Sequence, residues 1–128
     1  YVAVHNANAV AVIDTATHTV MARVPTEPGP VQVTVTPDQA SAYVCADGRG
    51  TVQKIDLSTN EVVRTIRIAP DAGTHGITFA AGGRYLIVTN MGTSTVSVID
   101  TASDRVIDSI RVAAAPEGLA FLPDEPSR

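Results

Sequence analysis

Hydrophobic and polar residues alternate along this chain in short runs that are rich in Val, Ile and Thr. Gly, Pro, Asn and Asp separate the runs at intervals of about 8–12 residues, as they do between strands of all-β proteins. The alternation has a period of two, and no useful length shows the helical period of 3.6. The pattern therefore predicts an all-β chain, with strands at 1–4, 9–13, 19–24, 31–36, 42–45, 51–55, 62–68, 76–80, 85–89, 95–99, 106–112 and 118–122.

An aspartate ends three of these runs, and its recurrence divides the chain into repeats. Asp56 follows Asp14 by 42 residues, and Asp100 follows Asp56 by 44. A second anchor lies 24, 26 and 24 residues after these aspartates, at Asp38, Gly82 and Asp124. The two extra residues of the middle unit therefore lie in a loop around 71–75. We predict one partial domain with repeats of about 1–30, 31–74 and 75–117, plus an innermost strand, 118–122, of a further unit.

Four antiparallel strands in each unit of 42–44 residues are typical of a β-propeller blade. Several short motifs stand out at characteristic places of individual units: Tyr43-Val44, Val88-Thr89-Asn90, the run 95–101, and Gly29-Pro30 followed by 33–38. Together these motifs resemble the YVTN-repeat β-propellers over essentially the whole chain, although Ile87 stands where the motif has Tyr. The resemblance implies a rigid, usually seven-bladed disc that is often exported and whose function differs between members.

Composition narrows the possible partners. Thirteen Asp and Glu stand against nine Lys and Arg, so the chain is mildly acidic and offers no electrostatic basis for binding duplex nucleic acid. Aromatic residues make up 4%, which predicts a core of small Val, Ile and Ala side chains. The single cysteine, Cys45, lies in a predicted strand, where we expect a buried thiol without a disulfide. No apolar run is long enough to span a membrane.

The turns after the third strand of each unit are nearly alike. Each begins with the repeat aspartate, and its fifth residue is His, Asn or Asp, the types most enriched in left-handed backbone. We expect the aspartates to cap the turns through side-chain-to-backbone hydrogen bonds. Three aspartates at a fixed period could also suggest a metal array, but one repeated structural turn explains them better. The predicted turn residues are Asp14, His18, Asp56, Asn60, Asp100 and Asp104.

The loops on the opposite face vary from unit to unit, and propellers usually carry a site on such a face. One set of loops joins second to third strands, at 5–8, 47–50 and 90–94. The other set joins one blade to the next, at 26–30, 70–75 and 115–117. We predict a ligand-binding role for the ionisable residues of this variable-loop face, with solvated loop charges as the alternative. They are His5, Glu27, Arg49, Asp71, His75 and Glu117.

Catalytic patterns are missing from the sequence. The three histidines lack the spacing of a metal site, Cys45 has no partner for zinc, and no serine lies in a nucleophile elbow. We therefore assign no catalytic residue, metal ligand or cofactor, and expect a non-enzymatic scaffold that binds a protein or a small ligand. The first alternative is a lactonase-like propeller hydrolase with a metal or acid–base site at the central channel. A weaker one is a single-stranded nucleic-acid binder.

Three units are fewer than the four to eight blades that usually close a propeller. We expect a segment of a longer propeller. The alternative is self-association, in which copies of the chain exchange the strand 118–122 if the chain is complete. By family resemblance, we expect an exported protein in the periplasm, at the cell surface or secreted.

Overall fold

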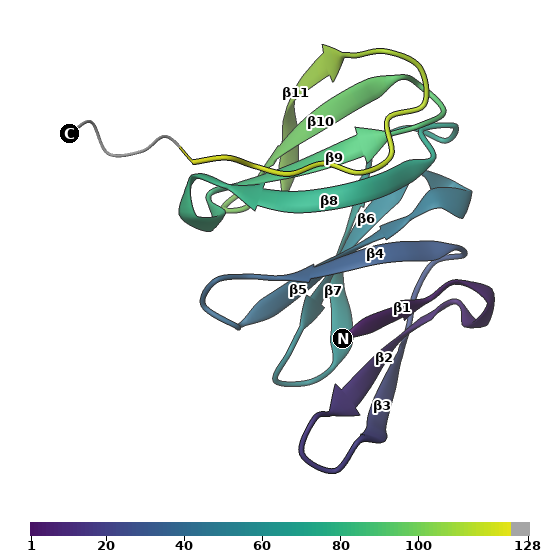
Figure 1. Ribbon diagram of the computed structural model, residues 1–128, viewed down its shortest axis with the longest axis vertical. Coiled ribbons are helices and arrows are strands. Elements are labelled where there is room, and N and C mark those ends of the chain that lie inside the picture. The colour runs from purple at the N-terminus through teal and green to yellow at the C-terminus, as the bar shows by residue number, and fades with distance from the viewer. Residues whose placement is uncertain (124–128) are drawn as a thin grey trace.

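The computed structural model describes residues 1–123, which form three antiparallel sheets that follow one another along the sequence (Figure 1). The sheets have the strand orders β1–β2–β3, β4–β5–β6–β7 and β8–β9–β10–β11. Their strands are β1 Val2–Val4, β2 Ala9–Asp14, β3 Thr19–Pro25, β4 Pro30–Val35, β5 Ser41–Ala46, β6 Thr51–Asp56, β7 Glu61–Arg67, β8 Thr74–Ala80, β9 Tyr85–Asn90, β10 Thr95–Asp100 and β11 Arg105–Arg111. The predicted all-β fold is confirmed, and these strands match the predicted ones to within two residues.

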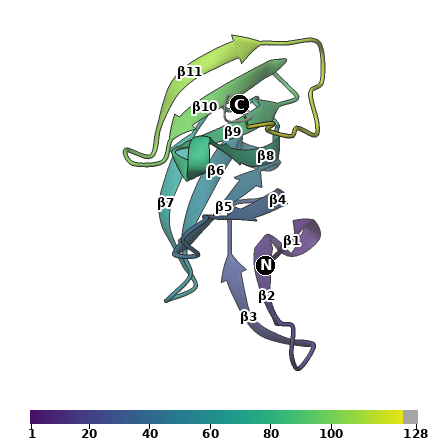
Figure 2. The ribbon, with the colours of Figure 1, turned by 60° about the vertical axis from the view of Figure 1, so that its left-hand side comes forward.

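The sheets lie against one another like successive propeller blades. The strands β4 and β8 form the inner edges of the second and third blades, and β4 contacts both β1 and β8. The strands β7 and β11 form the outer edges, on the other side of the molecule from β4 and β8 (Figure 2). The predicted extra residues lie between β7 and β8, in a loop two residues longer than that between β3 and β4.

Apolar side chains are buried mainly between neighbouring blades. Val10 and Val24 of the first blade pack with Val44 and Ile55 of the second. A second cluster joins the next two blades, and includes Val52, Ile66, Leu86, Val88 and Ile99. Each blade thus has a rear face toward the preceding blade and a forward face toward the following one. Burial of these faces is the main stabilising contribution to the arrangement.

The second and third strands of the blades are connected by short, tight turns. Two of them are 3₁₀ helices, His5–Ala7 and Asp47–Arg49, each followed by a left-handed residue, Asn8 or Gly50. A Cβ at Gly50 would lie 1.8 Å from the Ala69 carbonyl oxygen, so this position requires glycine. The loop 47–50 is therefore fixed against the loop that leads to the third blade.

The segment 118–122, predicted as the innermost strand of a further blade, is not a strand by itself within residues 1–123, and its pairing with a further blade stays a prediction. This segment runs alongside β8 (Figure 1), with Leu119 packed close to Gly76, as an innermost strand of a next blade would be placed. It has no ladder partner within residues 1–123, and a strand is defined by such a ladder. The anchor residue Asp124 lies outside the described residues. Within those residues, no helix is long and apolar enough to cross a membrane.

Candidate functional site

The turns between third and fourth strands are held by their own aspartates. The Asp14 carboxylate accepts the backbone N–H groups of Ala16 at 2.7 Å and Thr17 at 3.1 Å. Asp56 and Asp100 repeat this pattern, accepting from the backbone N–H groups of Ser58 at 2.7 Å and Ala102 at 3.1 Å. The hydroxyl and backbone N–H of Ser58 hold the pKa of Asp56 below its usual value. All three carboxylates therefore satisfy the turn backbone.

The fifth residue of each turn has left-handed backbone, with φ values of 57° at His18, 57° at Asn60 and 52° at Asp104. Two of these residues also reach the preceding blade. Asn60 accepts a hydrogen bond from the Tyr1 hydroxyl at 3.2 Å, and Asp104 accepts one from the Tyr43 hydroxyl at 2.6 Å. The turn residues thus connect blades as well as reverse the chain.

On the variable-loop face, the structure brings His5 next to the loop of the second blade. The His5 Nε2 atom lies 3.6 Å from the Asp47 carboxylate, and both side chains are partly open to solvent. The His5 Nδ1 atom contacts the Asn6 side-chain oxygen at 3.1 Å. His5 therefore contributes to a contact between loops of neighbouring blades.

Glu27 lies at the joint between the first and second blades. Its carboxylate accepts a hydrogen bond from the Thr51 hydroxyl at 2.7 Å, and its backbone N–H donates to the Gln53 side chain at 2.8 Å. Thr51 and Gln53 are both buried. These bonds hold the loop onto the second blade, so a ligand would have to displace one of them to use the Glu27 carboxylate.

Within residues 1–123, the side chains of the other four predicted ligand-binding residues make no hydrogen bond or ion pair with one another. Arg49, Asp71 and Glu117 are exposed, and His75 is half-buried. His75 and Glu117 hold equivalent repeat positions, each at the start of an innermost segment. Thr89 ties these two starts together, because its hydroxyl accepts from Gly76 N–H at 2.7 Å and donates to the Glu117 carbonyl at 2.6 Å.

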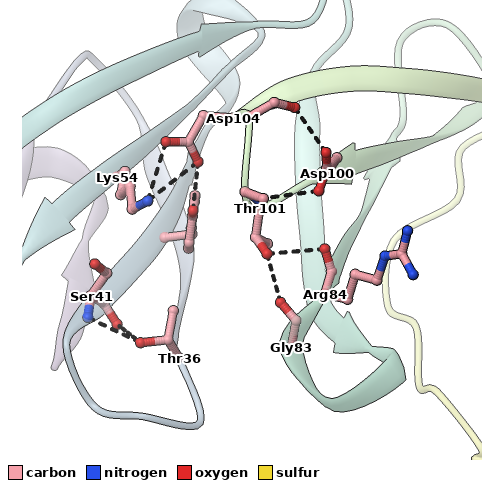
Figure 3. A network of polar contacts seen from close by, with 11 residues as sticks. Thr36, Ser41, Lys54, Gly83, Arg84, Asp100, Thr101 and Asp104 are labelled. Carbon is pink, nitrogen blue, oxygen red and sulfur yellow. Dashed lines mark hydrogen bonds and ion pairs between the residues drawn. The ribbon is translucent and has the colours of Figure 1, made fainter.

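A polar network that sequence reasoning missed lies on the opposite, turn face, between the second and third blades (Figure 3). The Lys54 Nζ atom lies 3.2 Å from an Asp104 carboxylate oxygen, and the same carboxylate accepts from buried Tyr43. Burial, and then the Asp104 carboxylate, raise the pKa of Tyr43. Beside this network is a cavity of about 250 Å³, lined by Thr36, Pro37, Asp38, Ser41, Tyr43, Lys54, Gly82, Gly83 and Thr101.

The repeat alignment contains the signal that could have revealed this network. Lys54 occupies a position that holds Val12 in the first unit and Val98 in the third. A lysine in a strand is usually a solvated surface charge, and the sequence alone does not show that Lys54 forms an ion pair with Asp104. The contact joins residues 50 positions apart on different blades.

A comparison with protein families gives a match over most of the chain. The model of the cytochrome D1 heme domain matches residues 1–119, which is nearly the whole chain. The chain belongs to this family. No curated protein sequence matches it at a significant level. The YVTN-repeat resemblance and the family match agree on a β-propeller, and that is what the two together establish.

Solved structures similar to this cytochrome D1 heme domain family member share its fold. Kuenenia stuttgartiensis hydrazine synthase has 24% identity and a TM-score of 0.83, over 89% of this chain and 33% of its own. Apo AztD from Citrobacter koseri has 20% identity and a TM-score of 0.71, over 87% of this chain and 31% of its own. The dihydro-heme d1 dehydrogenase NirN in complex with DHE has 17% identity and a TM-score of 0.73, over 82% of this chain and 23% of its own. The chain spans 23–33% of the length of these proteins.

The family name implies a heme, and residues 1–123 of this family member do not form a heme pocket by themselves. No group of three His, Cys, Asp or Glu side chains among them could hold a free metal ion, whereas a heme iron needs only one or two axial protein ligands. The cavity on the turn face is smaller than the roughly 300–1,000 Å³ of usual small-molecule sites. The loops of the variable-loop face carry no aromatic residue to stack on a macrocycle. His75 is the imidazole best placed to contribute to a site that includes other blades.

Proposed function

We propose that this chain is part of a non-enzymatic binding propeller whose variable-loop face takes up a protein or a small ligand. The observation that carries the proposal is a difference between the two faces. On the turn face, the capping aspartates Asp14, Asp56 and Asp100 all accept hydrogen bonds from backbone N–H groups. Within residues 1–123, the side chains of Arg49, Asp71, His75 and Glu117 make no hydrogen bond or ion pair, so their polar groups are available to a ligand.

The main alternative is a lactonase-like hydrolase that needs a metal or an acid–base pair at the central channel. Titration with zinc or calcium while unfolding is followed by temperature separates the two functions. A scaffold should keep its melting temperature at micromolar metal. A rise of several degrees that is lost in His75→Ala and kept in His18→Ala would favour the hydrolase, because only His75 lies at an innermost segment.

The family match favours tetrapyrrole binding as a second candidate function. One similar structure is a dihydro-heme d1 dehydrogenase in complex with DHE. Because residues 1–123 supply no closed heme pocket, we expect the isolated chain to produce no saturable change in the absorption spectrum of hemin. A saturable change that disappears in His75→Ala, but persists in the turn-face control His18→Ala, would replace the scaffold proposal with this candidate.

The organisation and location of the protein are proposed on the same basis. We propose one partial propeller domain with units at 1–30, 31–74, 75–117 and 118–122, belonging to a disc of about seven blades. The motif resemblance supports a YVTN-type propeller within the wider family. It also supports an exported protein, and antibody detection of the protein in periplasmic, surface and culture-medium fractions would test that proposal.

A further inference from the structure

The cavity on the turn face lies between the second and third blades, so both of its walls belong to the described residues. Thr36, Ser41 and Lys54 line it from the second blade, and Gly83 and Thr101 face them from the third (Figure 3). Its volume of about 250 Å³ equals that of about eight water molecules at ~30 Å³ each. The cavity is therefore too small for a macrocycle and large enough for a molecule between glycerol and a hexose in size.

The polar lining of this cavity departs from the repeat. Four positions that hold Thr, Asp, Ser and Lys in the second blade hold Ala, Gly, Tyr and Val in the third. The pairs are Thr36 and Ala80, Asp38 and Gly82, Ser41 and Tyr85, and Lys54 and Val98. The turn between β4 and β5 uses the side chains of Thr36 and Asp38, but not those of Ser41 and Lys54. The blade structure therefore does not require the last two groups.

Two hydrogen-bond donors in the second-blade wall have capacity to spare. Within residues 1–123, the hydrogen bonds of Ser41 involve its backbone, which leaves its hydroxyl free. The Lys54 ammonium contacts the two Asp104 carboxylate oxygens at 3.2 and 3.5 Å. An ammonium has three N–H groups, so at least one of them is available to a ligand.

Two acceptors of the cavity have spare capacity as well. Asp38 accepts from the Thr36 hydroxyl and from the Ala40 backbone N–H through the same carboxylate oxygen, so its other oxygen is free within residues 1–123. The Thr101 hydroxyl donates to the Gly83 carbonyl at 2.8 Å, and its own lone pairs remain available. The cavity thus offers donors and acceptors together.

The charges around the cavity disfavour an ionic ligand. Asp104 already pairs with the Lys54 ammonium, so the carboxylate of Asp38 is the remaining charge of the lining. An anion would approach Asp38 and Asp104, and a cation would approach Lys54, so either one meets a like charge in a small space. A hydroxyl group carries no charge and both donates and accepts, which suits the spare groups of both kinds.

We propose that the turn-face cavity is a second binding site, separate from the variable-loop face, for a small neutral polyhydroxylated molecule of the monosaccharide class. Hydroxyl groups of the ligand accept from Ser41 and Lys54 and donate to Asp38 and Thr101. The entrance passes Gly82, where a Cβ would meet nothing within 4 Å. The third blade therefore leaves the cavity open at the position where the second blade has Asp38.

Titration of sugars into ¹⁵N-glycine-labelled protein, followed by amide chemical shifts, tests the site and locates it. Gly82 and Gly83 line the cavity, whereas Gly48 and Gly50 lie in a loop of the variable-loop face. The probes are the neutral hexoses glucose, galactose and mannose, with glucuronate as an anionic analogue and glucosamine as a cationic one. We expect a neutral hexose to shift Gly82 and Gly83 saturably, with a dissociation constant of about 1 mM or more. Neither charged analogue should bind as tightly.

Ser41→Ala removes a hydroxyl that the fold does not use, so it should raise the dissociation constant about fivefold. Ser103→Ala is the matched control, because Ser103 also lies on the turn face but bonds to Asp100 at 3.0 Å and does not line the cavity. The control should leave the dissociation constant unchanged. The glycine spectrum without sugar verifies that each variant is folded.

Three results overturn the proposal. The first is that no neutral hexose binds, or that a charged analogue binds more tightly than all of them. The second is a set of shifts confined to Gly48 and Gly50, which would place sugar binding on the variable-loop face instead. The third is an equal effect of Ser41→Ala and Ser103→Ala.

Discussion

At the scale of single residues, Tyr43 links the second blade to the third. Its hydroxyl donates to Asp104 at 2.6 Å, and its ring packs edge-on against Phe79 with the centroids 5.9 Å apart. The Lys54 ammonium lies 5.4 Å from the ring centroid. A buried tyrosine needs a partner for its hydroxyl, and here that partner is an ionised carboxylate on the next blade.

Tyr43→Phe should therefore lower the free energy of unfolding by about 1–2 kcal/mol, since it removes a hydrogen bond to a charged group and keeps the ring. Tyr1→Phe is the control. Tyr1 makes the equivalent bond to Asn60 at 3.2 Å, but it is exposed to solvent, so its loss should cost less than about 0.5 kcal/mol. Urea unfolding measures both variants, and equal losses would contradict the role given to Tyr43.

The raised pKa of Tyr43 predicts a loss of stability in alkali. Above the ordinary tyrosine pKa of about 10, the unfolded chain releases the phenol proton while the folded chain keeps it. The unfolded state then binds fewer protons, so stability falls as pH rises. Melting temperatures between pH 9 and 11 should fall less steeply in Tyr43→Phe than in the parent chain. Identical slopes would show that this phenol does not contribute.

Acid should act on two turn carboxylates, Asp38 and Asp56. The Thr36 hydroxyl and the Ala40 backbone N–H lower the pKa of Asp38, and Ser58 lowers that of Asp56. Their contribution is present above the unfolded pKa of about 4 and is lost as pH falls through the folded values. Asp56→Asn should therefore reduce the dependence of the melting temperature on pH below about 4. A variant with the same acid dependence as the parent chain would contradict this assignment.

At the scale of elements, the junction between the second and third blades differs chemically from the one before it. Lys54 and Asp104 form a partly buried ion pair where the first junction has Val12 and Asn60 at the equivalent positions. Removing one partner of such a pair leaves an uncompensated charge, whereas replacing both is often nearly neutral. The first junction shows that the fold accepts Val and Asn in place of this Lys and Asp.

Lys54→Val alone should lower the free energy of unfolding by about 1–3 kcal/mol, because the Asp104 carboxylate loses its cation. The double variant Lys54→Val, Asp104→Asn reproduces the chemistry of the first junction and should return to within about 1 kcal/mol of the parent chain. Chemical unfolding of the two variants measures the coupling. A double variant at least as unstable as the single one would show that the ion pair itself holds the blades together.

The sequence was sufficient for the strands and for their connecting turns. Alternation marks each strand, and Asp14, Asp56 and Asp100 mark equivalent turns because their interactions are local. The polar network was not predictable, since Tyr43, Lys54 and Asp104 meet only when two blades pack together. The segment 118–122 has the sequence of a strand, but a ladder depends on a neighbour as well as on propensity. Likewise, His5 and Glu27 have predictable positions in loops and unpredictable partners.

At the scale of the whole molecule, the three blades divide their polar residues between a turn face and a variable-loop face. The turn-face aspartates Asp14, Asp56 and Asp100 stabilise the chain reversals, and two further turn residues, Asn60 and Asp104, also connect neighbouring blades. The variable-loop face includes residues that hold the loops together, such as Glu27, and residues that do not. A binding scaffold requires the stabilising residues to recur in every blade, because every blade must be stable. The residues that recognise a ligand can differ from blade to blade.

The most direct test of this division compares two triple variants by urea unfolding. Asp14→Ala, Asp56→Ala, Asp100→Ala removes the turn caps, and should lower the free energy of unfolding by about 0.5–2 kcal/mol for each cap, judged from the loss of helix caps. Arg49→Ala, Asp71→Ala, Glu117→Ala changes exposed loop residues and should leave it within about 0.5 kcal/mol per residue of the parent chain. If the loop variant is destabilised as strongly as the turn variant, the loop residues are structural and the variable-loop face is not free to bind.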